Sequence, residues 1–304
     1  MWYFYLIISL VLAPLLPGII NKTKASSAGR NGPRVLQLYY DIAKLLRKGT
    51  VRSTTSTILL QLAPSLSLAT LLTAMLFFPF GMSASPLAFQ GDIIVFFYLL
   101  ATGRMVMVLG ALDTGSAFEG MGASREVQFS ALAEVVTFAV IGFLALLSGS
   151  TSLSGALNGF NASAWTTTGT SMTLAAMACF VVLLAENCRV PFDDPDTHLE
   201  LTMIHEAMIL DNSGPDLAFI DYAAALKLWL LASFLVLLLL PFEPAWGATW
   251  RVATYFVGVL VTSVVVGITE SIMARFRFLK LPQLFAGALA IALVAILLFS
   301  FFKA

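Results

Sequence analysis

The sequence predicts an all-α polytopic membrane protein with eight transmembrane helices and one amphipathic helix on the inner side. Three observations carry this prediction. The composition is 59% hydrophobic and only 11% charged, the mean hydropathy is +0.91, and the basic residues gather in alternate connecting segments. Soluble domains have roughly 45–50% apolar residues. Because no polar stretch is long enough to hold a core of its own, residues 1–304 are interpreted as a single membrane domain.

Apolar windows define the eight spans, since a helix needs about 20 mostly apolar residues to cross a bilayer. The first window has no basic segment ahead of it and contains Pro14 and Pro17. It is therefore interpreted as a retained first helix and not as a secretory signal. Pro64 in the second window is tolerable where neighbouring groups take up the freed carbonyl. The predicted spans are 1–20, 58–80, 92–112, 129–147, 168–187, 223–241, 252–272 and 282–302.

The charges orient these spans. With the N-terminus outside, 14 of the 17 basic residues lie on the inner side; the exceptions are Arg104 within the third span and Arg251 and Lys303 outside. The positive-inside rule then places both termini outside. Of the 17 acids, only Asp92 and Glu243 lie toward the outside. Acidic residues contribute little to topology, so this asymmetry predicts that the chemistry or the partners lie at the inner face.

The first inside segment contains an amphipathic pattern. Over residues 34–48, Val35, Leu38, Ile42 and Leu45 recur at helical spacing, with basic and polar residues on the other faces. A basic amphipathic helix that follows a span typically lies in the membrane interface and contacts lipid headgroups. The alternative interpretation is that this helix flanks a docking site or the mouth of a cavity.

Ionisable residues also fall inside the spans or at their ends, namely Arg104, Asp113, Glu134, Glu186 and Glu270. Such residues are costly in a membrane and usually face a bundle interior or a wet cavity. Simple pairing is the alternative, since Arg104 could neutralise a Glu of a neighbouring helix. None of the acids within spans lies in the outer half of the membrane. The pattern therefore predicts an entry chamber that opens to the inside, with a lateral exit into another subunit.

The densest cluster of titratable groups lies within residues 186–206. Glu186 and Arg189 are three positions apart and are expected to share a helix face. Asp194 before Pro195 is interpreted as a helix N-cap or as a proton-handling group. A new helix is expected from Asp196, with Asp196 and Glu200 on one face and His198 and His205 on another. Histidines that bind zinc on one helix are usually four apart, so these two are interpreted as tuning groups and not as metal ligands.

Several functions are disfavoured. Zero net charge argues against a nucleic-acid partner. Two cysteines, Cys179 and Cys188, cannot build a four-thiolate iron–sulfur cluster and are interpreted as packing residues. The sequence has no nucleophile elbow and no HExxH motif, which argues against hydrolysis.

Four motifs carry a family resemblance that covers the whole chain. Ala-Glu-x-x-Arg-x-Pro-Phe-Asp over 185–193 resembles the signature of the first membrane subunit (subunit 1) of respiratory complex I. The segment Leu-Asp-Thr-Gly-Ser-Ala-Phe-Glu-Gly-Met-Gly-Ala-Ser-Arg-Glu over 112–126 is more similar to the corresponding subunit of formate hydrogenlyase and other energy-converting nickel–iron hydrogenases. The segments 32–46 and 270–278 resemble the family's first and last inside loops.

The resemblance implies a non-redox membrane subunit that anchors the peripheral arm and forms the chamber where redox chemistry is coupled to proton or sodium movement. Implied partners are a nickel–iron hydrogenase-like large subunit, a small iron–sulfur subunit and antiporter-like membrane subunits, in a bacterial or archaeal cell membrane. The chain itself is expected to bind no cofactor, although quinone stays open as a ligand of the chamber. Arg125, Glu134, Glu186, Arg189, Asp193 and Glu200 match motif positions. The full set expected in the chamber or ion pathway is Arg125, Glu126, Glu134, Glu186, Arg189, Asp193, Asp196, His198, Glu200, Glu206 and Glu270.

One departure bears on quinone. The family often has Pro-Glu-Ala-Glu-x-Glu-Leu after Phe-Asp, whereas this chain has Asp196 and His198 in place of two of the glutamates. Histidine titrates nearer neutrality than glutamate, so the acidic funnel is expected to be tuned differently. Three alternatives to a hydrogenase-type coupling subunit stay open: a quinone-binding subunit of a respiratory dehydrogenase, a free-standing secondary transporter and a bare structural anchor. No internal repeat of the kind transporters show is evident.

Overall fold

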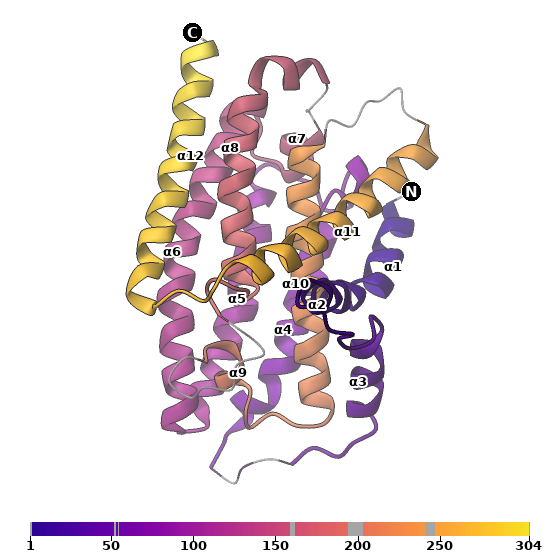
Figure 1. Ribbon diagram of the computed structural model, residues 1–304, viewed down its shortest axis with the longest axis vertical. Helices are drawn as coiled ribbons and strands as arrows, with labels where there is room; N and C mark the ends of the chain where they lie inside the picture. The colour runs from indigo at the N-terminus through magenta and orange to yellow at the C-terminus, as the bar shows by residue number, and fades with distance from the viewer. Residues whose placement is uncertain are drawn as a thin grey trace.

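The computed structural model describes residues 2–51, 53, 55–158, 162–193, 203–240 and 247–303, and in these ranges the regular structure is entirely helical (Figure 1). The all-α prediction is confirmed. The α-helices are α1 (Trp2–Leu12), α2 (Leu15–Ser27), α3 (Gln37–Leu45), α4 (Ile58–Phe77), α5 (Asp92–Asp113), α6 (Ala117–Ser148), α7 (Leu153–Asn158), α8 (Ala162–Glu186), α9 (His205–Met208), α10 (Pro215–Leu239), α11 (Ala248–Ile272) and α12 (Leu281–Lys303), with short 3₁₀ helices at Phe80–Met82 and Phe278–Lys280.

Within the described ranges, seven helices are long and apolar enough to cross a membrane, and α1 with α2 would make an eighth if the bent pair is one span. The pair bends by 49°. Pro14 lies at the break and has no N–H to continue the helix. The first predicted span therefore corresponds to two short helices, and α2 runs on to Ser27.

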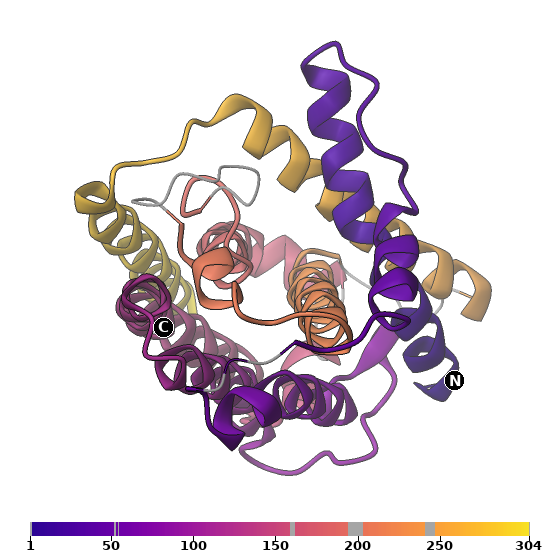
Figure 2. The same cartoon turned by 90° about the horizontal axis from the view of Figure 1, so that it is seen from below.

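Helix α10 lies at the centre of the bundle. Figure 2 shows α10 ringed by the other helices. Of its most apolar window, 78% is buried, against 28–50% for the other candidate spans. It begins at Pro215 after Gly214, whose φ of 58° suits glycine. The prediction that residues 215–222 belong to a connecting segment is wrong, because Pro at the first helical position starts the helix there.

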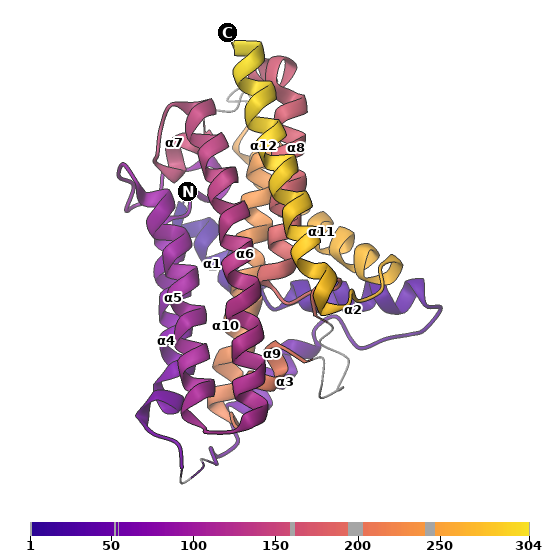
Figure 3. The same cartoon turned by 90° about the vertical axis from the view of Figure 1, so that its left-hand side faces the viewer.

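Two helices run across the bundle. In Figures 1 and 3, α2 and α11 cross the direction of α6, α8 and α12. Their contact is close because Gly267 has no side chain: a Cβ there would lie 3.1 Å from the Ile20 carbonyl oxygen and 2.8 Å from Thr23 Cβ. An ion pair between Lys24 and Glu270 reinforces the crossing, with 3.2 Å between Nζ and Oε2.

The amphipathic inside helix is present as α3 but is shorter than the pattern over 34–48 indicates. None of its residues is buried. Tyr40 is exposed within it, and Leu36 and Leu46 are exposed at its two ends. Leu38 instead faces an internal cavity. One side of α3 thus offers apolar groups to the surroundings while another side lines the interior.

Carboxylates fix both ends of α5. At its start, buried Asp92 accepts hydrogen bonds from the Leu153 backbone N–H and from Ser152 Oγ at 3.1 Å, which holds α7. At its end, Asp113 accepts bonds from the backbone N–H and the hydroxyl of Thr57, both at 2.7 Å, where α4 begins. Asp113 therefore has a structural role at the start of α4.

Candidate functional site

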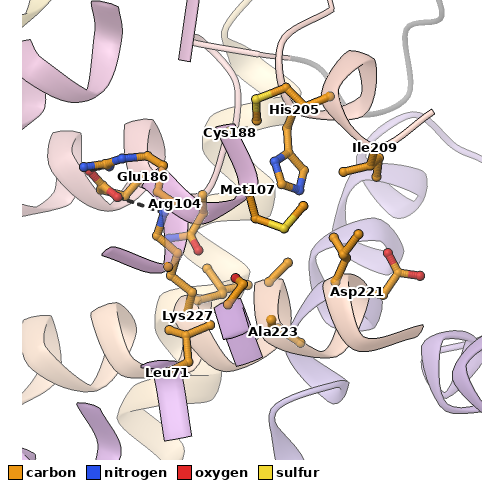
Figure 4. A pocket seen from close by; sticks show the side chains of 18 of the residues that line it. Leu71, Arg104, Met107, Glu186, Cys188, His205, Ile209, Asp221, Ala223 and Lys227 are labelled. Atoms are coloured by element: carbon orange, nitrogen blue, oxygen red, sulfur yellow. Dashed lines mark hydrogen bonds and ion pairs between the residues drawn. The ribbon is translucent and has the colours of Figure 1, made fainter. Parts of the chain in front are cut away.

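A cavity of about 250 Å³ lies between α4, α5, α6 and α10, beside the segment that follows α8. Figure 4 shows part of its wall. One part of the lining is apolar, with Leu71, Met107 and Ile220 among its residues. Its ionisable residues come from α5, α6, α8, α9, α10 and the segment after α8: Arg104, Glu126, Glu186, Cys188, Arg189, Asp193, His205, Glu206, Asp221 and Lys227.

Glu186 closes α8 and bonds to two cations at once. Its Oε1 accepts a hydrogen bond from Arg104 of α5, and its Oε2 lies 2.8 Å from Lys227 Nζ of α10. The three side chains are only 11–15% exposed. Figure 4 shows them grouped at one end of the cavity, with Asp221 toward the other. Each buried ion loses several kcal/mol of hydration free energy. Two cationic partners offset this cost for the carboxylate more fully than a single partner would.

Arg189 does not share a helix face with Glu186. Helix α8 ends at Glu186, and Cys188 has a φ of 49°, a region unusual for a residue with a side chain. The Arg189 N–H then donates to the Leu184 carbonyl at 2.9 Å, which completes the helix end. The turn directs Arg189 to Glu270 of α11, with 3.6 Å between Nη1 and Oε1. Spacing predicted a shared face because it assumed that the helix continues to Pro191.

Glu270 lies at the junction of three segments. Its side chain is fully buried and makes ion pairs with Lys24 of α2 and with Arg189 after α8. It is not part of the cavity lining. Its position indicates a structural role: Glu270 holds Arg189, which forms part of the cavity wall.

Asp193 connects the chain on the two sides of residues 194–202. It pairs with Arg275, with 3.0 Å between Nη2 and Oδ1. Its Oδ2 accepts hydrogen bonds from the backbone N–H groups of Ile204 at 3.1 Å and His205 at 3.3 Å. Four residues singled out from the sequence fall outside the described residues: Asp194, Asp196, His198 and Glu200.

Arg125 anchors the segment that begins at Met203. Its Nη1 donates to the Met203 carbonyl at 3.0 Å, and its guanidinium lies over the Phe278 ring, 4.7 Å from the ring centre. Arg275 lies 5.4 Å from the same ring. Arg125 does not line the cavity, and its contacts are those of a structural clamp.

Glu126, the next residue, faces the cavity. It is 7% exposed, and the Cys188 thiol donates to its Oε2 across 3.6 Å. In the described residues no cation lies within ion-pair distance of this carboxylate. Burial, together with the nearby negative charges of Glu126 and Asp193, raises the pKa of Cys188 well above its ordinary value. Cys188 therefore stays a neutral thiol and a hydrogen-bond donor, a role that the packing interpretation missed.

His205 also lines the cavity, beside Glu206. Burial, together with the nearby positive charge of Lys227 and against the opposing effect of Asp193, lowers the pKa of His205 to about 4. The imidazole is therefore neutral at pH 7. Its neutral ring adds hydrogen-bonding capacity to the wall without adding charge.

Glu134 lies in a second, smaller cavity of about 30 Å³, formed by α5, α6, α8 and α10. Leu100, Arg104 and Glu186 line both cavities. Sequence reasoning missed Lys227 and Asp221 as site residues. Spacing could not reveal them, because Asp221 was placed in a loop and Lys227 was counted only toward topology.

The described residues contain no group of three or more His, Cys, Asp or Glu side chains that could hold a metal ion. The chemistry that the geometry supports is the holding and transfer of protons among carboxylates in a partly apolar enclosure. Of the predicted residues that the structure describes, five line the larger cavity, Glu134 lines the smaller one, and Arg125 and Glu270 brace the walls: the five are Glu126, Glu186, Arg189, Asp193 and Glu206.

Comparisons with known proteins agree with this architecture. A family model described as NADH dehydrogenase matches residues 1–300. Hydrogenase-4 component C of Escherichia coli strain K12 is 34% identical over 278 residues, covering 90% of this chain and 87% of the relative. Formate hydrogenlyase subunit 4 of the same strain is 30% identical over 290 residues, with 93% of each chain covered. A chain of the membrane-bound sulfane sulfur reductase, an archaeal respiratory membrane complex, has the same fold, with a TM-score of 0.85, 20% identity and 97% of both chains covered.

Proposed function

The chain belongs to the NADH dehydrogenase family, and from that premise we propose that it is a membrane-embedded coupling and anchoring subunit of a complex I-like hydrogenase of the formate hydrogenlyase type. In this proposal the chain carries no redox centre. It links a peripheral redox arm to the movement of protons, or sodium ions, through an acidic chamber open to the cytoplasmic side. Both termini face outward.

The relatives support the hydrogenase branch. The two that are at least 30% identical are named as parts of hydrogenase-4 and formate hydrogenlyase, and each aligns over most of its own length. The partners proposed on this basis are a nickel–iron hydrogenase-like large subunit, a small iron–sulfur subunit and antiporter-like membrane subunits.

One observation carries the proposal: ionisable side chains from five helices, each buried or half-buried, meet in one cavity, and a further carboxylate, Glu134, lies just beyond it. Charged groups are costly in an apolar surrounding and are retained where they pair or carry ions. Glu186 is neutralised by Arg104 and Lys227. Among the described residues no cation lies within ion-pair distance of Glu126, whose hydrogen-bond partner is the neutral thiol of Cys188, and Glu126 is therefore a carboxylate that can take up a proton.

The segment 203–205, which Asp193 and Arg125 hold, gives the cavity wall a way to respond to a docked partner. Both anchors hold the segment 203–205, which leads directly into His205 and Glu206 of the lining. A displacement of this segment by a redox subunit would move both side chains relative to Glu126. In this scheme a displacement of the cavity wall changes the electrostatic surroundings of Glu126, and this change couples the redox arm to ion movement.

A quinone-binding subunit is the second candidate. The apolar part of the cavity, with Leu71, Met107 and Ile220, suits a ring with a hydrocarbon tail, and the polar part offers donors such as His205 and Arg189. A free-standing secondary transporter fits less well, because the sequence shows no internal repeat of the kind that transporters have.

Purification in mild detergent separates these candidates. We expect the full-length chain to copurify with a nickel–iron large subunit and a small iron–sulfur subunit. Stoichiometric quinone together with a flavin-containing module would instead support the second candidate. Isolation as a monomer that transports ions by itself would overturn both.

A further inference from the structure

The two cavities are neighbours with a common wall of only three residues. Leu100 and Arg104 come from consecutive turns of α5, and Glu186 comes from the end of α8. Leu100 is apolar and buried. The polar part of the wall is thus the Arg104–Glu186 ion pair, and a hydrated route through this wall has to pass it.

The ion pair between Arg104 and Glu186 can break while Glu186 keeps its second cationic partner, Lys227. Arg104 and Lys227 bond to different oxygens of Glu186. If the guanidinium moves away, the carboxylate keeps the ammonium at 2.8 Å and is not left as an unpaired buried charge. Breaking a buried pair usually costs about 3–5 kcal/mol because one ion loses its partner, and the second cation reduces that cost.

The backbone at Arg104 is held in place by a close helix contact, whereas the long side chain of Arg104 can change its conformation. A Cβ at the preceding residue, Gly103, would lie 2.6 Å from Thr70 Oγ1, so α4 and α5 are in direct contact at this turn. Movement of the helix is restricted there. The rotatable bonds of the arginine side chain therefore provide the available motion.

We propose that the Arg104–Glu186 ion pair is the gate between the larger cavity, which is the chamber, and the smaller cavity that contains Glu134, which is the Glu134 cavity. Lys227 remains paired with Glu186 while the gate is open. This rests on the proposed function and specifies which residues control the proton's way out. In the closed state water reaches Glu126 but not Glu134. When Arg104 swings aside, water joins the two cavities, and a proton released by a carboxylic acid of the chamber is taken up by the Glu134 carboxylate.

Thiol accessibility tests the gate without requiring turnover. Thr137 lines the Glu134 cavity and not the chamber. Thr137→Cys would be placed in the full chain carrying Cys179→Ala and Cys188→Ala, within the whole complex in inverted membrane vesicles. The probe is sulfonatoethyl methanethiosulfonate, a charged reagent that does not cross membranes, and labelling is measured by intact mass.

With Arg104 present, we expect slow labelling of the new cysteine. Arg104→Ala should raise the rate about tenfold or more, because local opening free energies set the exposed population. Arg104→Met retains much of the side-chain volume but cannot pair, and should also accelerate labelling if Arg104→Ala fails to assemble. Arg104→Lys can still pair with Glu186 and should remain slow. A chain with Cys188 as its single cysteine is the control for chamber access; the raised pKa of this thiol makes the reaction slow, and its rate should be the same in every background.

Fast labelling with Arg104 intact, or equal rates in all four backgrounds, would overturn the gate. These outcomes are independent of the proposed function, because labelling is measured in resting vesicles. Failure of the coupling proposal would appear instead as normal ion pumping when Glu126 is replaced by Gln.

Discussion

The Lys24 ammonium lies 3.2 Å from the Glu270 carboxylate and joins the two helices, α2 and α11, that cross the bundle. Arg189 approaches the same carboxylate from the end of α8. Since the Glu270 side chain is fully buried, the two cations compensate a charge that would otherwise be isolated. This junction supports the wall that carries Arg189 into the cavity.

Glu270→Gln should therefore destabilise the protein. Removing the buried anion leaves two cations with less compensation, and we expect a loss of about 3 kcal/mol in unfolding free energy. Thermal unfolding in detergent measures it. Lys24→Gln should lower the midpoint, whereas Lys44→Gln, on the exposed face of α3, should leave it unchanged. Equal midpoints for both lysine variants would contradict the role given to the junction.

Glu126→Gln and Glu134→Gln should each abolish ion pumping while the complex still assembles. Each change removes one carboxylate of the proposed path and keeps the size and hydrogen-bonding capacity of the side chain. The matched control is Glu119→Gln, on the same helix and buried, but outside both cavities. Pumping in vesicles and subunit content on native gels are the two readouts. Normal pumping in either path variant would remove that residue from the path.

Glu186→Gln should be more severe than either, because it leaves Arg104 and Lys227 facing each other without their common anion. We expect both loss of coupled activity and a lower unfolding midpoint. Glu186→Gln combined with Lys227→Met should recover part of the stability but none of the pumping. If the double variant is no more stable than the single one, repulsion between Arg104 and Lys227 is not the cause of the instability of Glu186→Gln.

Cys188 should react slowly with thiol reagents at neutral pH, since its raised pKa keeps the thiolate population small. The labelling rate should keep rising as pH increases beyond the ordinary range for a thiol. Glu126→Gln removes a negative charge beside the thiol and should therefore lower its pKa and speed the reaction at pH 8. Cys179, which is buried and does not line the cavity, is the internal control and should stay unlabelled. An unchanged rate in Glu126→Gln would contradict the contact.

His205 should make the protein sensitive to mild acid. Its pKa of about 4 in the folded state lies below the ordinary value of 6.5, so the unfolded state binds more protons between these pH values. The stabilising contribution is complete above pH 6.5 and is lost progressively as pH falls toward 4. His205→Asn should flatten the decline of the unfolding midpoint over this window. A midpoint that declines equally in both proteins would exclude His205 as the cause.

The helical architecture could be predicted because each span is a local property of about 20 residues. The eight predicted windows correspond to seven long helices and the bent pair. The break at Pro14 was not predicted, although the proline was visible, because prolines occur within membrane helices when neighbouring groups compensate. The start of α10 was missed because residues 215–222 contain two aspartates and lower the hydropathy of that stretch.

The site was predictable as a set of charges but not as a set of pairs. Arg104 and Glu186 are 82 residues apart, and nothing in either segment specifies the other. A local rule assigned Glu186 to Arg189, and it failed because the chain turns at Cys188 directly after α8. Lys227 gave no local signal beyond its charge. The partners depend on how α5, α8 and α10 pack, which is a property of the whole bundle.

The central place of α10 has a consequence for how the protein is made. This helix carries Asp221 and Lys227 yet is enclosed by other helices, so in its final position it meets little lipid. Alone in a bilayer, both charges would be costly. The chain order resolves this, since α5 with Arg104 and α8 with Glu186 are synthesised first. When α10 leaves the ribosome, the anion that receives Lys227 is already in the membrane, so the Glu186–Lys227 ion pair guides the placement of α10 before α11 and α12 follow.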